Sequence, residues 1–531
     1  MSSSTEALPR PGSLLHASPA LRWILRLLLA AVSGALLSLA FPPVGFGWAA
    51  LAGTVLLLAL IVHARLWHAV VLSYAAAAVF FLLMLHWLTV VGSDAWILLS
   101  LVCALYFGLM GAGIALLSRL PLWPIWVAGA WVGQEWLRGT FPFGGFPWGN
   151  LAFSQVDTPL GRLSMIVGAL AASGAVVLCA AALLAGWQRL RAWDLRAGAA
   201  WLGTALALVL LPCLLQPPTA GDTVGGTPAA SIAVVQGGTP QTGLGAMDVR
   251  RAVLDNHVRQ TMELAREVAL GSRPRPDFVL WPENASDLDP SIDEAAAAAI
   301  GTSVRAMNTP VLVGAIVNVP GDPSSVWNQG ILWDPVTGPG ASYSKTHPVP
   351  FGEYLPFRSI LGTLIDRFAR ISRDFAAGDR PGLFSIDGVA VGDVICFEIA
   401  YNAVVDPLID GGARVLTVQT NNATYGGTAQ PAQQLQIERF RALETGRSVV
   451  VAATTGISAF IGPDGQVLQQ MDEGEVGSMV QTVPLRGAQH LSAHLGRPLA
   501  AAWALASLAL ALFVGLRLSE KSRRLRRKVR G

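Results

Sequence analysis

A single cysteine, Cys396, stands where the sequence could place a nucleophile at the end of a β-strand. The apolar run of residues 389–395 predicts a strand, and Cys396 follows it directly, with an aromatic residue and a carboxylate behind it. Such a cysteine could also be one more small buried hydrophobic residue. Two upstream segments favour the chemical interpretation, because Trp281-Pro282-Glu283 and residues 345–354 carry further reactive side chains.

Cys396, Glu283 and Lys345 are the residue types that acyl transfer through a thioester requires. A thiolate attacks the acyl carbonyl, a base takes the thiol proton and relays protons, and a positive charge or N–H donor stabilises the oxyanion. Taken singly, Glu283 and Lys345 could be solvated surface side chains. The spacing of these three residues in the sequence does not by itself show that they lie together in the fold. Whether they do depends on the strands and loops that carry them.

Composition divides the chain into a membrane part and a water-facing part. Of the 531 residues, 53% are hydrophobic and only 13% are charged, whereas charged residues make up about 25% of ordinary globular proteins. The mean hydropathy is +0.50. Apolar residues dominate 22–216 and 497–516, while 231–490 has globular composition and follows a Pro/Gly/Thr-rich linker at 217–230. We expect a polytopic membrane protein that carries one globular domain.

Apolar runs of about 20 residues, the length that crosses a bilayer, predict eight membrane-spanning helices. They lie near residues 23–41, 46–62, 69–91, 96–117, 121–138, 160–186, 197–216 and 497–516. Basic residues gather in one set of connections, on the same side as a Ser/Pro/Ala-rich leader at 1–21 and a basic tail at 517–531. The positive-inside rule places these segments in the cytoplasm, and the globular domain, which follows the seventh span, outside it. No cleavage site marks the leader as a signal peptide.

The charge pattern and the four cysteines limit the cellular compartments and the classes of binding partner that fit this sequence. The net charge is +3, and much of the basic excess follows the last apolar run, which favours anionic lipid over nucleic acid as its partner. Three cysteines fall inside predicted spans, so no disulfide framework is expected. Cys396 is the one cysteine of the globular domain, and an unpaired thiol on the oxidising side of a membrane is a liability unless it is used.

The connection at residues 138–159 is rich in glycine, proline and aromatic residues, Phe146 and Trp148 among them. Such rings commonly form a belt at the membrane surface, but this loop could also shape a cleft for lipid entry. Glu135 and Arg138 stand at its start. Charges at this depth are functional candidates, and an ion pair between residues three apart on one helix is the structural alternative.

Strands and helices alternate through the globular domain. We expect strands at 231–237, 278–281, 310–317, 330–333, 389–395, 415–419 and 448–453, helices at 247–269, 295–307 and 431–445, and a hairpin around 463–465. This alternation predicts a layered α/β domain rather than a barrel. Between residues 351 and 384, apolar residues recur every three or four positions from Phe357 to Phe368. This spacing indicates an amphipathic helix that either packs on the core or dips into the membrane interface.

Three segments of the globular domain resemble the carbon–nitrogen hydrolase, or nitrilase, superfamily. They are Trp281-Pro282-Glu283-Asn284-Ala285, residues 343–356 and Gly392-Asp393-Val394-Ile395-Cys396-Phe397-Glu398. The eight-span pattern, with Glu135-Trp136-Leu137-Arg138-Gly139 and Phe146-Pro147-Trp148, is similar to the apolipoprotein N-acyltransferases, the membrane branch of that superfamily. The resemblance covers residues 22–516.

The resemblance implies an extracytoplasmic αββα sandwich on a bundle of eight helices in the bacterial inner membrane, and a two-step acyl transfer. Cys396 would take an acyl chain from a phospholipid as a thioester and pass it to the N-terminal α-amine of a diacylglyceryl-cysteine lipoprotein, the last step of lipoprotein maturation. Glu283 would be the general base and Lys345 the oxyanion stabiliser. Glu353 would be a second carboxylate that orients Lys345, and Glu398 a pocket residue.

The substrate pocket expected from the same resemblance is lined by Phe146, Trp148, Phe397, Asn421 and Asn422. Two of these positions depart from the family pattern. Relatives often have tyrosine in place of Phe397, and an Asn-Asp-Ala-Trp-Phe run where this chain has residues 420–426. These departures bear on recognition of the acceptor rather than on the triad.

Two other functions would use some of the same features. A membrane-anchored amidase would hydrolyse small amides with the same triad and water as acceptor, but eight spans exceed what an anchor needs. A lipoprotein-binding scaffold would not require all three triad residue types. No cofactor or metal is expected, since no Cys/His cluster has ligand spacing. We expect a monomer whose partners are phospholipid, lipoprotein and membrane lipid.

Overall fold

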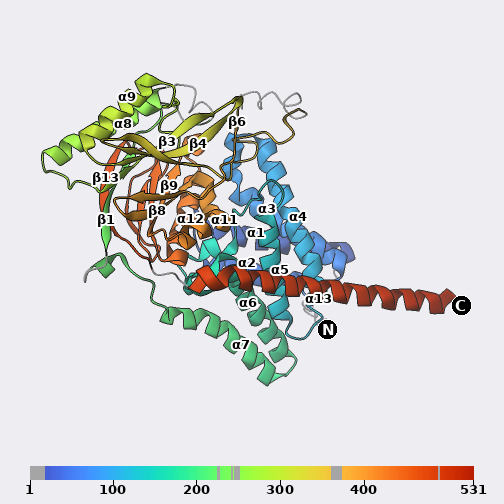
Figure 1. Ribbon diagram of the computed structural model, residues 1–531. Coiled ribbons are helices and arrows are strands. Elements are labelled where there is room, and N and C mark those ends of the chain that lie inside the picture. Colours follow the sequence, from blue (N-terminus) through green and yellow to red (C-terminus); the bar gives the residue numbers. More distant parts are fainter. Residues whose placement is uncertain are drawn as a thin grey trace, which may run out of the picture.

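The computed structural model describes residues 18–223, 228–240, 243, 251–359, 373–487 and 491–530. Long apolar helices form one part of the molecule, and an α/β sandwich stands against one end of them (Figure 1). The long C-terminal helix runs from the junction of the two parts, along the helices and away from the sandwich.

The helical part has a helix in each of the eight stretches that the sequence marked. They are α1 (Pro19–Leu39), α2 (Trp48–Ile61), α3 (Leu66–Met84), α4 (Ser93–Leu117), α5 (Trp123–Arg138), α6 (Ser164–Arg191), α7 (Leu195–Leu210) and α13 (Leu491–Arg530). Among the described residues, six helices are long and apolar enough to cross a membrane: α1, α3, α4, α6, α7 and α13. Helix α2 has 14 residues, and α5 has 16 and contains Glu135 and Arg138. By the length and composition of these helices, the chain is a membrane protein.

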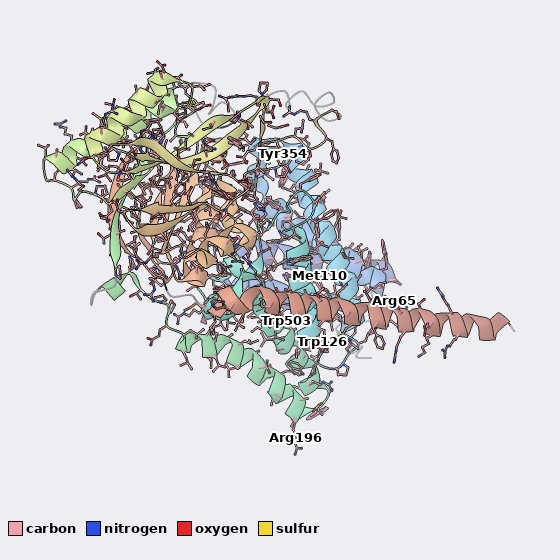
Figure 2. The ribbon with its side chains drawn as sticks, viewed as in Figure 1. Arg65, Met110, Trp126, Arg196, Tyr354 and Trp503 are labelled. Carbon is pink, nitrogen blue, oxygen red and sulfur yellow. The ribbon has the colours of Figure 1, made fainter. Side chains whose placement is uncertain are left out.

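Small residues let these helices pack closely. A Cβ at Gly34 of α1 would lie 2.0 Å from the backbone oxygen of Ala76 in α3, so only glycine allows this crossing. Arg65 and Arg196 lie at the end of the helical part that faces away from the sandwich, whereas Tyr354 lies where sandwich and helices meet (Figure 2).

Two segment boundaries differ from the sequence prediction. Helix α1 begins at Pro19, within the predicted leader, because the Ser18 side chain caps it by accepting a hydrogen bond from the Leu21 backbone N–H. Helix α13 continues through the predicted basic tail to Arg530. Residues 1–17 of the leader lie outside the described residues, and so do residues 360–372, which contain most of the predicted amphipathic helix.

Two mixed sheets form the sandwich, and every predicted strand belongs to one of them. The first sheet has the order β13-β1-β2-β3-β4-β5, with β6 beside β4, and consists of β1 (Ala229–Gln236), β2 (Phe278–Leu280), β3 (Val311–Val319), β4 (Asp322–Asp334), β5 (Gly338–Ser344), β6 (Asp374–Phe375) and β13 (Gly477–Pro484). The second has the order β12-β11-β10-β9-β8-β7, with β7 (Leu383–Ile386), β8 (Val389–Ile395), β9 (Val415–Thr420), β10 (Ser448–Ala453), β11 (Ala459–Ile461) and β12 (Val467–Gln470). The predicted hairpin is the β11–β12 pair.

Helices cover the outer face of each sheet. Helices α8 (Ala252–Ala269) and α9 (Glu294–Met307) pack on the first sheet through residues such as Leu254 and Ile300. Helices α11 (Asn402–Asp410) and α12 (Gln430–Thr445) pack on the second. Between the sheets lies a core that includes Ile232 and Val391. The layers confirm the predicted αββα sandwich.

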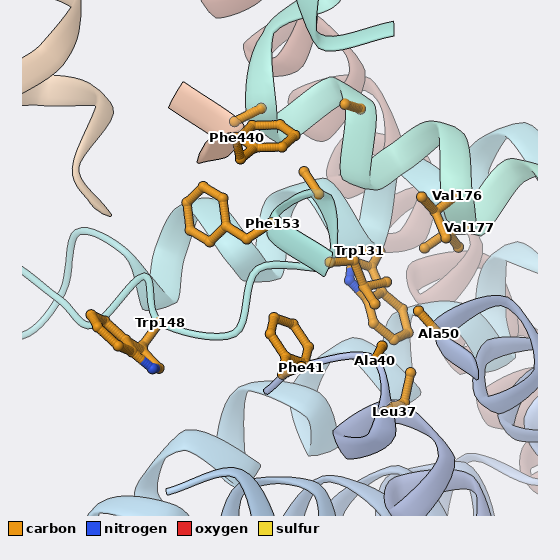
Figure 3. Packing of buried hydrophobic residues seen from close by; sticks show 14 of the residues in the cluster. Leu37, Ala40, Phe41, Ala50, Trp131, Trp148, Phe153, Val176, Val177 and Phe440 are labelled. Atoms are coloured by element: carbon orange, nitrogen blue, oxygen red, sulfur yellow. The ribbon is translucent and has the colours of Figure 1, made fainter. Parts of the chain in front are cut away.

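The largest cluster of buried apolar side chains joins the sandwich to the helices. It contains residues of α1 to α6 together with residues of α11 and α12. Phe153, in the connection before α6, meets Phe440 of α12 edge-on, with ring centroids 5.4 Å apart (Figure 3). Because this core is continuous, the sandwich is fixed against the membrane helices.

Candidate active site

Cys396 occupies a sharp turn at the end of β8. Its φ angle is 57°, a left-handed conformation that is uncommon for any residue but glycine. The turn leads into the short 3₁₀-helix η9 (Cys396–Ala400). Since β8 runs parallel to β9, with Ile395 opposite Gln419, Cys396 reaches the sheet edge beside Thr420. The Thr420 hydroxyl donates a hydrogen bond of 3.3 Å to the Cys396 Sγ.

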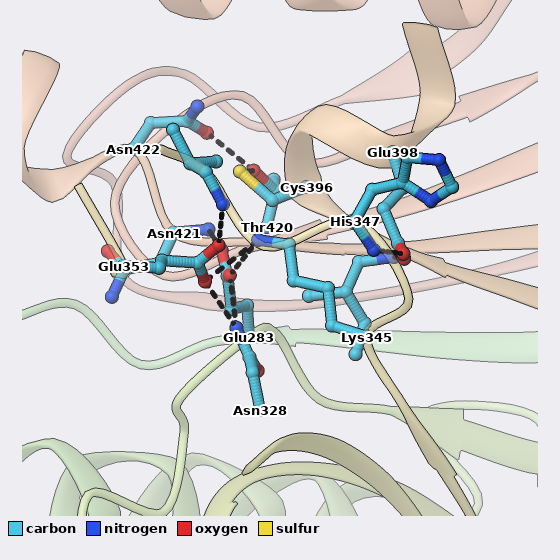
Figure 4. Close-up of polar contacts among 12 residues, drawn as sticks. Glu283, Asn328, Lys345, His347, Glu353, Cys396, Glu398, Thr420, Asn421 and Asn422 are labelled. Atoms are coloured by element: carbon cyan, nitrogen blue, oxygen red, sulfur yellow. Dashed lines mark hydrogen bonds and ion pairs between the residues drawn. The ribbon is translucent and has the colours of Figure 1, made fainter. Parts of the chain in front are cut away.

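Lys345 lies between two carboxylates in front of this turn (Figure 4). Its Nζ is 3.2 Å from Glu283 Oε1 and 2.9 Å from Glu353 Oε1. The Asn328 amide donates to the same two oxygens, at 2.6 Å and 3.1 Å. The other Glu283 oxygen accepts the Asn421 backbone N–H at 2.8 Å. The fold therefore brings Glu283, Lys345 and Glu353 together next to Cys396.

Burial sets the protonation behaviour of this cluster, since Glu283 is 4% exposed and Lys345 only 1%. Burial raises the pKa of Glu283, although the Lys345 ammonium opposes the shift. For Lys345, burial acts to lower the pKa, but the charges of Glu283 and Glu353 outweigh it and hold the pKa well above its usual value. Lys345 therefore stays cationic, and Glu283 is a stronger base than a solvated carboxylate.

The thiol of Cys396 is protonated in the resting site. Desolvation and the negative charge of Glu283 raise its pKa to about 12, against the opposing effect of Lys345 and of the Thr420 hydrogen bond. Thiolate must therefore form when a base accepts the proton, rather than stand ready at neutral pH.

Glu398 is completely buried and organises the backbone around the site. Its carboxylate accepts hydrogen bonds from the backbone N–H groups of Ile395, Thr346 and His347, at 2.9, 2.7 and 3.0 Å. The Tyr343 hydroxyl donates to it as well. Glu398 thus ties the residue before Cys396 to the residues after Lys345, so the structure places this predicted pocket residue behind the site.

Three of the predicted pocket residues form an aromatic stack beside the nucleophile. The Phe397 ring lies nearly parallel to those of Phe146 and Trp148, with centroid distances of 5.5 and 5.3 Å. The connection at 138–159 therefore contacts the residue that follows Cys396. Tyr401 adds an edge-on contact to Phe397 and donates to the Gly145 carbonyl at 2.8 Å.

The two predicted asparagines differ in position. Asn421 contributes its backbone N–H to Glu283. Asn422 is buried, and its amide donates to Gln430 and Gln434 of α12 at 2.9 and 3.0 Å. It therefore packs behind the site and is not exposed at its surface.

Tyr401 lines two cavities. A cavity of about 370 Å³ is bounded by Phe143, Thr346, His347 and Tyr354, directly after Lys345. A larger one, of about 480 Å³, lies between α5, α6 and α13 and the sandwich helices α11 and α12. The smaller cavity is lined by Thr346 and His347, the two residues that follow Lys345. Among the described residues, no group of three His, Cys, Asp or Glu side chains is placed to hold a metal ion.

Glu135 and Arg138 shape the connection at 138–159 instead of bonding to each other. Arg138 donates to the carbonyls of Phe146 and Trp148, at 2.6 Å each, and to Asn150 at 2.7 Å. Glu135 accepts the Leu151 backbone N–H at 2.9 Å. Their hydrogen bonds hold the aromatic residues of this loop in place.

Sequence reasoning missed three residues of the site. Asn328 bridges two carboxylates, Thr420 contacts the sulfur, and Gln433 of α12 accepts hydrogen bonds from Trp148 and Trp87, at 2.8 and 3.0 Å. None of the three carried a local signal, because Asn328 lies outside the predicted strand at 330–333 and the contacts of all three join segments that are distant in sequence.

Family models match both parts of the chain. The model of the apolipoprotein N-acyltransferase N-terminal domain matches residues 33–182, and the carbon-nitrogen hydrolase model matches residues 232–492. An apolipoprotein N-acyltransferase from Mycolicibacterium smegmatis is 40% identical over 463 residues, which are 84% of this chain and 78% of that protein. This chain belongs to the apolipoprotein N-acyltransferase family.

More distant members of the apolipoprotein N-acyltransferase family match as well. The Shewanella oneidensis enzyme is 27% identical over 75% of this chain and 76% of its own length. Among solved structures, an amidase from Nesterenkonia is similar, with 18% identity and a TM-score of 0.35, over 51% of this chain and 95% of that chain. Family membership makes this chain an enzyme of the acyltransferase type, with a nitrilase-like domain.

Proposed function

We propose that this chain moves a fatty acyl chain from a phospholipid, through a thioester on Cys396, to the N-terminal α-amine of a diacylglyceryl-cysteine lipoprotein. The observation that carries the proposal is the buried Glu283–Lys345–Glu353 cluster at the thiol of Cys396, set where the sandwich meets apolar membrane helices. The names of the similar proteins support the same acceptor class.

In the first step, Glu283 takes the thiol proton and the Cys396 sulfur attacks the ester carbonyl of the phospholipid. Two of the three Lys345 N–H groups go to Glu283 and Glu353, which leaves the third for the oxyanion of the tetrahedral intermediate. The C–O bond to glycerol then breaks, Glu283 returns the proton to the alkoxide, and a lysophospholipid leaves. The acyl group remains on sulfur.

In the second step, the lipoprotein amine attacks the thioester carbonyl. Glu283 removes a proton from the attacking nitrogen, Lys345 again stabilises the oxyanion, and the C–S bond breaks. The thiolate that leaves recovers a proton from Glu283. Glu353 and Asn328 hold the Glu283 and Lys345 side chains in register through both steps.

The membrane arrangement belongs to the proposal too. We infer eight spans, with α2 and α5 as short ones, and the domain boundaries that the composition indicated, apart from the start of α1 and the two ends of α13. We also infer an inner-membrane location with the sandwich outside the cytoplasm. Support comes from Arg65 and Arg196, which lie at the end of the helices away from the sandwich (Figure 2).

The aromatic stack supports a lipid substrate rather than a small amide. Phe146 and Phe397 lie half-buried beside the nucleophile, and the buried ring of Trp148 stacks against Phe397. Phe146 and Trp148 come from the connection between membrane helices. A small amide would gain nothing from this surface, whereas an acyl chain that leaves the bilayer would be covered by it.

A product assay separates transfer from hydrolysis. Purified protein in detergent is incubated with phospholipid and a synthetic diacylated lipopeptide, and the products are identified by mass spectrometry. We expect triacylated lipopeptide and lysophospholipid in equal amounts. Free fatty acid as the main product, with or without lipopeptide, would contradict the proposal and favour the membrane-anchored amidase.

A further inference from the structure

The Thr420 hydroxyl belongs to a buried hydrogen-bond network. This network determines which acceptor the hydroxyl proton faces. The centre of the network is the Gln434 amide of α12, which is 2% exposed. Its Oε1 accepts from the amides of Asn422 and Gln430, at 3.0 and 3.1 Å. Its Nε2 therefore faces the other way, where it donates to Thr420 Oγ1 and Glu438 Oε1, at 3.0 Å each.

This donation leaves the Thr420 proton free to be given to another atom. Two acceptors lie in reach: Cys396 Sγ at 3.3 Å and Asn422 Oδ1 at 3.4 Å. A distance of 3.4 Å is long for a hydrogen bond between two oxygens, which prefer about 2.7 Å. Sulfur is larger, so 3.3 Å is a close contact for it. These distances favour the sulfur, which becomes a strong acceptor once it is a thiolate.

We propose that Thr420 is a catalytic residue that donates its hydroxyl proton as a hydrogen bond to the thiolate of Cys396, and that Gln434 is the positioning residue that points it there. The inference rests on the proposed role of Cys396 as nucleophile. Thr420 is then a third group that affects the ionisation of the Cys396 thiol, besides Lys345 and Glu283.

Glu438 is the acceptor at the other end of this hydrogen-bond network. It is 1% exposed, and burial raises its pKa to about 8, so it is largely uncharged at neutral pH. A neutral acid can accept the second Gln434 N–H without adding a negative charge near the sulfur. The fixed amide thus supports thiolate formation, whereas a buried carboxylate would oppose it.

The test measures the thiol itself, without lipid. Alkylation of Cys396 by iodoacetamide is followed at about pH 8 by mass spectrometry of its peptide in the wild type, Thr420→Val and Thr420→Ser. Because hydrogen bonds to charged groups stabilise them strongly, we expect Thr420→Val to react about 10-fold more slowly. Thr420→Ser, which keeps the hydroxyl, should react within about threefold of the wild type.

Thr445→Val is the matched control, because Thr445 is also a buried threonine, and its hydroxyl bonds to the Arg441 carbonyl of its own helix. It should alkylate at the wild-type rate. Thr420→Ala replaces Thr420→Val if the valine variant does not fold, and should show the same loss. Equal rates in the wild type and the hydroxyl-free variant, or an equal loss in Thr420→Ser, would overturn the role of Thr420. Slow alkylation in Thr420→Val combined with no acyl transfer by the wild type would instead sink the proposed function alone.

Discussion

Charge balance governs the candidate site at the level of single residues. Glu283 and Glu353 face one ammonium, that of Lys345, in a buried setting. The cluster carries an excess negative charge while Glu283 is ionised, and becomes neutral when Glu283 takes a proton. In the proposed first step, transfer of the Cys396 proton to Glu283 therefore moves the excess negative charge onto the sulfur, which then attacks the acyl carbonyl. Such a buried cluster is better explained by chemistry than by stability.

Asn328 offers a test of this balance through the pH profile. Asn328→Leu removes a donor that lowers the pKa of Glu283, so this pKa should rise further. Since the base must be ionised, activity exists above its pKa and is lost as the pH falls through it. The acidic limb of kcat/KM against pH should therefore move up by about one pH unit.

Gln329→Leu is the control for this experiment. Gln329 is the next residue of β4 and bonds to Ser344 rather than to the triad, so its acidic limb should stay in place. An unmoved limb in Asn328→Leu would contradict the assignment of Glu283 as the base.

Motifs in the sequence led to the prediction of Glu283, Lys345 and Cys396 as a triad, and the structure places the three side chains close together. The sequence did not predict Asn328 or Thr420 as partners, since their roles depend on distances between β4, β9 and the loops after β2 and β8. It also placed Glu398 in the pocket, and the structure instead buries it behind Cys396, where backbone and side-chain donors hold it.

At the level of elements, helix α12 connects the sandwich to the membrane helices. Gln433 accepts from the indoles of Trp87 and Trp148 and donates to the carbonyls of Pro42 and Met84, at 3.0 Å each. One buried amide thus joins α12 to three connections of the helical part, and it sets the Trp148 ring that stacks on Phe397.

Replacing this amide should loosen the junction. Gln433→Leu leaves two indole N–H groups and two carbonyls without their partner, a loss of about 3 kcal/mol or more in the free energy of unfolding. Gln436→Leu on the same helix is the control, because Gln436 makes a single 3.4 Å bond to Ala40. Thermal unfolding in detergent should show a clearly larger fall in Tm for Gln433→Leu, and equal falls would argue against this junction.

On the scale of the whole molecule, the sidedness of the sandwich can be tested directly. Arg275→Cys, exposed on the sandwich, and Arg196→Cys, exposed at the far end of the helices, are compared in intact spheroplasts, both in a Cys213→Ser background that removes an exposed thiol. A membrane-impermeant maleimide should label Arg275→Cys and leave Arg196→Cys unlabelled until the cells are lysed. The opposite pattern would place the sandwich in the cytoplasm.

Much of this architecture could be predicted from the sequence, because apolar runs and the alternation of strands and helices are local signals. Each predicted membrane helix and each predicted strand lies at or near its predicted residues. What local signals do not contain is the docking of the parts. Nothing in residues 138–159 alone shows that Phe146 and Trp148 stack on Phe397, since that contact depends on how the two parts pack.

The most direct test of the central claim is the covalent intermediate on Cys396. Purified protein is incubated with acyl-labelled phospholipid, without acceptor, and digested for mass spectrometry. We predict an acyl group on the peptide that contains Cys396, removed by neutral hydroxylamine, as expected of a thioester, and lost in Cys396→Ala. Label that survives hydroxylamine, that lies on another residue, or that persists in Cys396→Ala would contradict the account.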